Sequence, residues 1–99
     1  MFFKGGIMDT KYIESWLRDV AFKGMLRKDG FTPMAEHSIN VGRLLKERGY
    51  DDITVFTGYY HDVIEDCSEN FPEMDMNKIV LKQARLFFNE NQAEEALNL

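Results

Sequence analysis

The side chains that could do chemistry are concentrated in the run HDVIED at residues 61–66, which directly follows an apolar stretch. On a helix, residues four apart share a face, which pairs His61 with Glu65. The same spacing pairs Asp62 with Asp66. Burying carboxylates is costly unless a partner compensates them, and a metal ion is such a partner. Because an imidazole beside a carboxylate can bind a divalent cation, the run predicts a metal-dependent enzyme site.

The only other histidine in the sequence, His37, lies upstream on a separate predicted helix. A lone inward-facing histidine is more often an ordinary core residue, and an isolated His-Asp pair is common on solvated surfaces. The second histidine and the further acids shift that balance toward a site. An all-helical interaction domain without any site remains an alternative, and it predicts that His37 and His61 face solvent.

In these two segments the chain resembles the HD-domain metal phosphohydrolases, and more narrowly the hydrolase half of the RelA/SpoT guanosine tetraphosphate enzymes. The first matching block is AFKGMLRKDGFTPMAEHS at residues 21–38, and the second is YYHDVIED at residues 59–66. The two blocks stand in the family's order with similar spacing. The Glu-Asp pair that ends the second block distinguishes this subgroup from other HD proteins. The resemblance extends from about residue 9 to about residue 91.

The resemblance implies a divalent metal cofactor, which is Mn²⁺ in this family. The implied metal ligands are His37, His61 and Asp62. The family's site is completed by a further Asp on a later helix, and the sequence ends at Leu99 before any matching position. We therefore expect an incomplete set of ligands and weak metal binding.

The resemblance also implies a reaction and a substrate. Glu65 and Asp66 would position or activate a water molecule that attacks a phosphate, and would handle the proton of the leaving group. The substrate implied by the family is a guanosine that carries a 3′-pyrophosphate. Arg27 and Lys28 would contact this nucleotide, with the arginine stacked on the base.

Departures from the family pattern keep other interpretations open. Met25, Met34 and the pair Tyr59–Tyr60 replace residues that are usual in the family, so a hydrolase acting on a different nucleotide remains possible. The absent last ligand supports another alternative. In that alternative the chain is a catalytically inactive nucleotide-binding or regulatory module that retains the pocket without turnover.

The composition limits the partners and the cellular compartment. A net charge of −5 argues against a duplex nucleic-acid partner, which normally meets a basic surface, but not against a single nucleotide. No apolar run reaches the length of a membrane span. The single cysteine, Cys67, cannot form an intrachain disulfide and suits the cytoplasm. We expect this thiol to be buried and inert because the adjacent acids raise its pKa.

The 99 residues, of which 44% are hydrophobic, are enough for one domain or part of one. We expect residues 1–8 to be a poorly ordered leader and residues 9–99 to be the N-terminal part of an HD-type hydrolase domain. The absence of later helices would leave apolar helix faces exposed, which favours a homo-oligomer.

Apolar residues at helical spacing predict four helices, near residues 10–27, 33–48, 52–66 and 75–90, and no strand. The region 93–99 has only a weak helical pattern. The predicted fold class is therefore all-α, an HD-domain-like helical bundle that is incomplete on its C-terminal side.

Capping residues support the starts of these helices. The predicted N-caps are Thr10, Thr32, Asp51 or Asp52, and Asp75. On the second helix His37 shares a stripe with apolar residues, so we expect its side chain to point inward.

Overall fold

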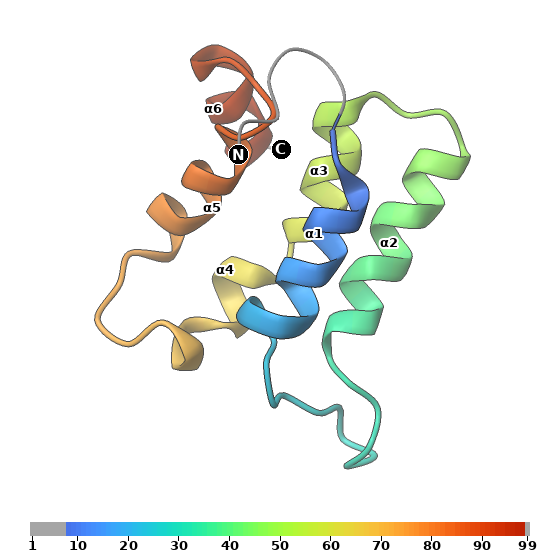
Figure 1. The fold of residues 1–99 in the computed structure, drawn as a ribbon, viewed down its shortest axis with the longest axis vertical. Helices are drawn as coiled ribbons and strands as arrows, with labels where there is room; N and C mark the ends of the chain where they lie inside the picture. The colour runs from blue at the N-terminus through green and yellow to red at the C-terminus, as the bar shows by residue number, and fades with distance from the viewer. Residues whose placement is uncertain (1–7, 99) are drawn as a thin grey trace.

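The computed structural model describes residues 8–98, and every regular element in that range is helical (Figure 1). The longer helices are α1 (Thr10–Trp16), α2 (Ala35–Glu47), α3 (Asp52–Tyr60), α5 (Met76–Ala84) and α6 (Glu90–Asn98). Shorter pieces are the π-helix η1 (Leu17–Ala21), α4 (Val63–Asp66) and the 3₁₀ turn η2 (Ser68–Asn70). The predicted all-α fold class is confirmed, while the finer prediction of an HD-like bundle stays a prediction. None of the helices in the described part is long and apolar enough to cross a membrane.

Helix α3 is the centre of the fold. Its residues Val55, Phe56 and Tyr59 are almost completely buried. In Figure 1, α1 and α2 lie beside α3 on one side, and α5 and α6 lie on the other. The Thr57 hydroxyl donates a 3.0 Å hydrogen bond to the carbonyl oxygen of Ala96, which fixes α6 against α3.

Two glycines allow α2 and α3 to pack closely. A Cβ atom on Gly42 of α2 would come within 2.4 Å of the Tyr59 ring, and one on Gly58 of α3 within 2.4 Å of the Leu45 side chain. Contacts that short do not occur, so a larger residue at Gly42 would push against the buried Tyr59 ring, whereas at Gly58 the end of the Leu45 side chain would have to move. The glycines therefore set the distance between the helices that flank the histidines.

A charged side chain on α1 connects three helices. Glu14 accepts a 2.8 Å hydrogen bond from the Tyr59 hydroxyl on α3 and forms a 2.6 Å ion pair with Arg43 on α2. Its side chain is only 13% exposed. Because a buried carboxylate needs such partners, this contact fixes α1 over the groove between α2 and α3.

An aromatic cluster fills the space between α1, α3 and the segment after η2. Trp16, the only tryptophan, lies 5.6 Å from Tyr60 and 6.1 Å from Phe71 between ring centroids. Tyr60 also stacks on Phe56 at 4.1 Å, and its hydroxyl donates to Gln83 of α5. The buried hydroxyl therefore has the partner that a buried polar group requires.

The caps agree with the sequence-based predictions only in part. Asp51 and Asp75 cap α3 and α5, as predicted. The predicted caps Thr10 and Thr32 are wrong. Asp9 caps α1 by accepting a hydrogen bond from the backbone N–H of Tyr12. Thr32 lies in a turn, and its backbone N–H and its hydroxyl both donate to the Asp29 carboxylate.

The first predicted helix, 10–27, is too long. It is an α-helix only to Trp16, widens to a π-helix as far as Ala21, and is followed by a loop in which Gly24 has a φ of +77°. A left-handed φ of this kind suits glycine and ends a helix. The loop then runs to α2, which begins at Ala35, close to the predicted start.

The third predicted helix, 52–66, is interrupted after Tyr60 by a turn at His61 and Asp62, and α4 then begins at Val63. The reason is local. The Nδ1 of His61 lies 2.7 Å from the carbonyl oxygen of Gly58, so the ring occupies an acceptor that a continuous helix would use for its own backbone bond.

The fourth predicted helix, 75–90, is also wrong in extent. Helix α5 ends at Ala84, and a separate helix, α6, runs from Glu90 to Asn98. Asn89 and Gln92 exchange side-chain-to-backbone hydrogen bonds, which is a capping box for α6. The buried Ala93 and Ala96 hold this helix, whose sequence has only a weak helical pattern.

Most of the leader predicted for residues 1–8 lies outside the described residues. Its last residue, Met8, is buried and belongs to the core.

Candidate metal centre

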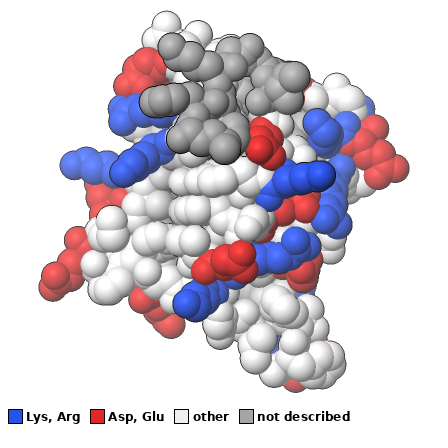
Figure 2. All heavy atoms as spheres, viewed as in Figure 1, with Lys and Arg blue, Asp and Glu red and all other residues white. Residues whose placement is uncertain are grey.

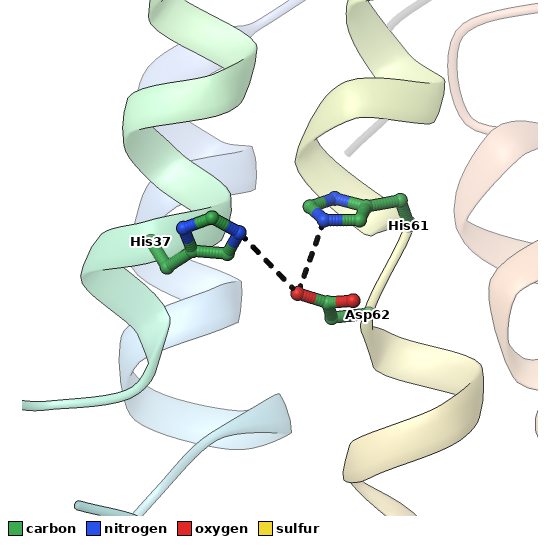
Figure 3. A group of neighbouring side chains, drawn as sticks. All are labelled: His37, His61 and Asp62. Atoms are coloured by element: carbon green, nitrogen blue, oxygen red, sulfur yellow. Dashed lines mark ion pairs between the residues drawn. The ribbon is translucent and has the colours of Figure 1, made fainter. Parts of the chain in front are cut away.

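Two histidines and an aspartate converge between α2 and the end of α3 (Figure 3). His37 comes from α2, and His61 and Asp62 form the turn after α3. The Asp62 Oδ2 lies 3.0 Å from the Nε2 of His61 and 3.7 Å from the Nε2 of His37. One ligand atom from each of the three residues lies within 4.8 Å of the others. Atoms at these separations can be brought onto a single cation by small side-chain movements.

The hydrogen bond to the Gly58 carbonyl decides how His61 presents its ring. A carbonyl oxygen can only accept, so the Nδ1 of His61 carries the proton. In the neutral ring, the lone pair is then on Nε2, which points at the Asp62 carboxylate. An imidazole lone pair and a carboxylate oxygen repel each other unless a cation or a proton lies between them. A backbone bond that fixes the tautomer is a common feature of metal-binding histidines.

The site lies at the surface rather than in the core. The exposed fractions of the side chains are 52% for His37, 35% for His61 and 25% for Asp62. The prediction that His37 points inward is therefore wrong, because the apolar side of α2 is centred on Ala35 and Ile39 instead. An interaction domain without a site predicts partly exposed imidazoles. It does not predict that both imidazoles converge on one carboxylate.

Next to the three residues is a cavity of about 670 Å³. It is lined by Phe22, Leu26, Arg27, Lys28, Asp29, Met34, His37, Asp62 and Asp66. The loop therefore contributes the cations Arg27 and Lys28 together with Asp29, and the helical body contributes His37 with two acids. This is a distribution of charge that suits an anionic ligand with a bound cation at one end.

The two acids of the predicted catalytic pair lie in different surroundings. Asp66 is half-buried and lines the cavity, and its backbone N–H bonds to the carbonyl of Asp62 at 2.8 Å. Glu65 is exposed and does not line the cavity. The assumption of a continuous buried helix through this run is wrong, so the acids do not share one environment. Their catalytic roles stay predictions.

Two further residues near the site bear on its chemistry. Cys67 is fully buried, and burial, with Asp66 and Asp62 nearby, raises the pKa of its thiol to about 12, as the sequence suggested for an inert cysteine. Asp29 on the cavity wall is absent from the site predicted from the sequence. Its signal is the Asp-x-x-Thr spacing, in which the carboxylate accepts from the N–H groups of Phe31 and Thr32.

No model of a known protein family matches the sequence, and no solved structure gives a significant match. The resemblance to the HD-domain phosphohydrolases therefore stays a prediction that depends on the two sequence blocks.

Proposed function

We propose that the chain is a metal-dependent phosphohydrolase that acts on a nucleotide, resembling guanosine 3′,5′-bis(diphosphate) 3′-pyrophosphohydrolase. The observation that supports this most directly is the convergence of His37, His61 and Asp62 beside a cavity that also carries Arg27 and Lys28. An isolated cluster on a flat surface would not support a substrate. Here His37, Asp62 and the two cations line one open cavity at the surface.

The chemistry of the donor atoms fits a divalent transition metal. Two imidazole nitrogens and one carboxylate suit manganese, iron or zinc better than calcium, which prefers oxygen ligands. Three protein ligands also leave coordination positions for water and substrate, as catalytic sites require. When bound, such a cation lowers the pKa of a coordinated water and neutralises charge that develops on a phosphate. Mn²⁺ is the cofactor we propose, in line with the family resemblance.

The residues around the cavity divide the remaining tasks. Asp66 is the acid we assign to accept the proton of the attacking water, because it lines the cavity one turn beyond Asp62. Arg27 and Lys28 on the loop would hold the negative phosphates and the base. Phe22 and Met34 supply apolar surface in the same cavity. A ligand with phosphates at one end and a flat apolar body suits that arrangement.

A second candidate is a nucleotide-binding or regulatory module without turnover. The observation in its favour is the exposure of the imidazoles, since water competes for a metal held by two partly solvated histidines. Such a module would bind the nucleotide through the same cations and leave it intact.

The experiment that separates these candidates combines metal content with turnover. The purified chain is loaded with Mn²⁺, its bound metal is measured, and pyrophosphate release from guanosine tetraphosphate is compared with phosphate release from nucleoside monophosphates. The proposal expects bound metal and preferential pyrophosphate release. Metal and nucleotide binding without turnover would establish the regulatory module, and a chain that binds no divalent metal would refute both versions of the metal site.

A further inference from the structure

A loop that projects from the helical body carries the cations of the cavity. Residues 25–34, called here the flap, form the protrusion at the bottom of Figures 1 and 2. The flap is closed on itself by backbone hydrogen bonds from Met34 to Met25 and from Arg27 to the carbonyl of Thr32. Asp29 also fixes its tip by accepting from Phe31 and Thr32. The flap is therefore a small unit with its own internal bonds.

At one end, the flap is connected to the helical body by a short segment at Gly24. Gly24, directly before the flap, has a φ of +77°, and no atom lies within 4 Å of the position of its absent Cβ. A second cavity of about 240 Å³ lies beside the flap, and Phe22 and Leu26 line both this cavity and the large one. There is thus open space on both sides of the segment that leads into the flap. Met25 and Met34, the two ends of the flap, pack against the core, whereas the part between them has open space beside it.

One side chain from a distant segment holds that attachment. The side-chain amide of Asn70, in η2, donates to the carbonyl oxygen of Ala21 at 2.9 Å and to that of Lys23 at 3.1 Å. Ala21 is the last residue of η1 and Lys23 lies two residues beyond it, and the end of a helix leaves carbonyl acceptors without partners inside the helix. The backbone N–H of Asn70 bonds in turn to the carbonyl of Cys67, the residue after Asp66. Asn70 thus connects the wall that carries Asp66 to Ala21 and Lys23, in the segment that leads to Gly24.

We propose that Asn70 is a positioning residue that fixes the flap relative to His37 and Asp62, so that Arg27 and Lys28 face the metal centre across the cavity. The amide acts through the carbonyls of Ala21 and Lys23 and touches no ligand. Loss of its two donors releases the segment around Gly24, while Met34 stays bonded to the start of α2, so the flap becomes more mobile at one of its two ends. The cations then spend less time facing the site, while the three clustered side chains keep their places.

The experiment compares Asn70→Asp and Asn70→Ala with the unaltered chain. Asn70→Asp keeps the side-chain shape but replaces the donors by an anion facing two carbonyl oxygens. Backbone order parameters of residues 25–34 should fall from about 0.85, the value of rigid backbone, to below about 0.6. Amide exchange at Met25 should rise on the order of tenfold, since its N–H bonds to Phe22 at the base of the flap. Helix α3 should keep its order parameters and its exchange rates.

Asn91→Asp is the matched control, because it makes the same chemical change at an exposed position on α6. It should leave the flap unchanged. If both Asn70 variants keep a rigid flap, the proposal is wrong. If exchange rises equally in the flap and in α3, Asn70 contributes only to overall stability, and the proposal is wrong in that case too. Asn70→Ala, which introduces no charge, decides the matter if Asn70→Asp does not fold.

A second measurement concerns the nucleotide and rests on the proposed function. The Asn70 variants should raise the Michaelis constant for guanosine tetraphosphate roughly tenfold, while kcat and Mn²⁺ content stay nearly unchanged. This is the result expected when a contact is lost that stabilises the ground state and the transition state equally. A fall in kcat with an unchanged Michaelis constant would contradict the positioning role. If the unaltered chain shows no turnover, the proposed function fails, whereas the order parameters still test the role of Asn70.

Discussion

Asp62 is the residue on which both imidazoles converge, so its removal tests the metal centre most directly. Asp62→Ala and His61→Ala should each weaken Mn²⁺ binding at least about 100-fold. Mutating a residue that only hydrogen-bonds to a metal ligand already lowers metal affinity by up to about 100-fold, and these two residues would be ligands themselves. Activity should be lost together with the metal. The measurement is metal content after dialysis against a fixed free concentration.

Asp66→Asn and Glu65→Gln complete this test, because neither side chain belongs to the converging cluster. Both should keep the metal. Asp66→Asn should lower turnover by on the order of 100-fold or more, as expected for loss of a proton acceptor. Glu65, which is exposed and does not line the cavity, is the comparison, and a larger effect at Glu65 than at Asp66 would contradict the assignment of the base.

The contribution of Arg27 to nucleotide binding can also be measured separately. Arg27→Ala should raise the Michaelis constant for the nucleotide roughly tenfold with little change in kcat, because the contact is made equally before and during the reaction. Arg48→Ala, an exposed arginine at the end of α2, is the control. An unchanged Michaelis constant in Arg27→Ala would refute the role of the loop in binding the nucleotide.

At the scale of single residues, the sequence predicted which side chains meet but not how they are exposed. The convergence of His37, His61 and Asp62 was predictable because two matching blocks pointed to the same cluster. The separation of Glu65 from Asp66 was not predictable. It depends on the hydrogen bond between the His61 imidazole and the Gly58 carbonyl, which ends α3. Helical periodicity in the sequence does not predict this bond.

At the scale of the helices, the distance between α2 and α3 depends on Gly42. Gly42→Ala should lower the free energy of unfolding by about 1–3 kcal/mol, the usual effect of overpacking a core, because the added methyl meets the Tyr59 ring. Lys46→Ala on the exposed part of the same helix is the control. Chemical denaturation provides the measurement, and equal stability of the two variants would contradict the close packing.

Glu14 gives the α1 attachment a defined dependence on pH. The Arg43 guanidinium, and then the Tyr59 hydroxyl, lower the pKa of Glu14 from its ordinary value of 4.5, although burial opposes them. A lowered folded-state pKa means that the unfolded chain binds more protons at acid pH. The stabilisation is therefore fully present above pH 4.5 and is lost as the pH falls below it.

Glu14→Gln tests this dependence. It should cost about 1–3 kcal/mol of stability at neutral pH, as expected for hydrogen bonds to a charged group, and should flatten the acid limb of the stability curve. Glu90→Gln is the control. Glu90 also pairs with an arginine, but its side chain is 56% exposed, so water screens the pair. Parallel pH profiles for the unaltered chain and Glu14→Gln would show that Glu14 does not control acid stability.

Helix boundaries were the least predictable part of the fold. Asp51 and Asp75 were found from sequence because an acid before an apolar pattern is a strong local signal. Helix α6 has the local signal too, in the pair Asn89 and Gln92, but its apolar pattern is weak because small alanines form its buried side. The end of α1 was missed because Gly24 lies well after the point at which the helix widens.

At the scale of the whole molecule, the surface leaves large apolar side chains in water. On the face drawn in Figure 2, an uncharged area lies left of the centre, and charged residues of both signs surround it. Among the described residues, the exposed large apolar side chains are Val20, Leu26, Phe31, Leu44, Tyr50 and Met74. Exposed apolar surface favours association.

We expect the chain to form a dimer or a higher oligomer at high concentration, measured by light scattering across a dilution series. Phe31→Ser should weaken the association if the flap takes part, and Leu44→Ser if the outer side of α2 does, since these side chains are 77% and 46% exposed. A well-behaved monomer at high concentration would contradict the expectation.

Trp16 gives the molecule an optical reporter without any labelling. It is the only indole in the chain, and its ring lies against Tyr60 on α3 and Phe71 just beyond η2. Its emission wavelength and its quenching by iodide therefore report whether these two distant segments remain closed around α1. A red shift that precedes the loss of helical circular dichroism would reveal that the segment around Phe71 opens first, before the helices melt.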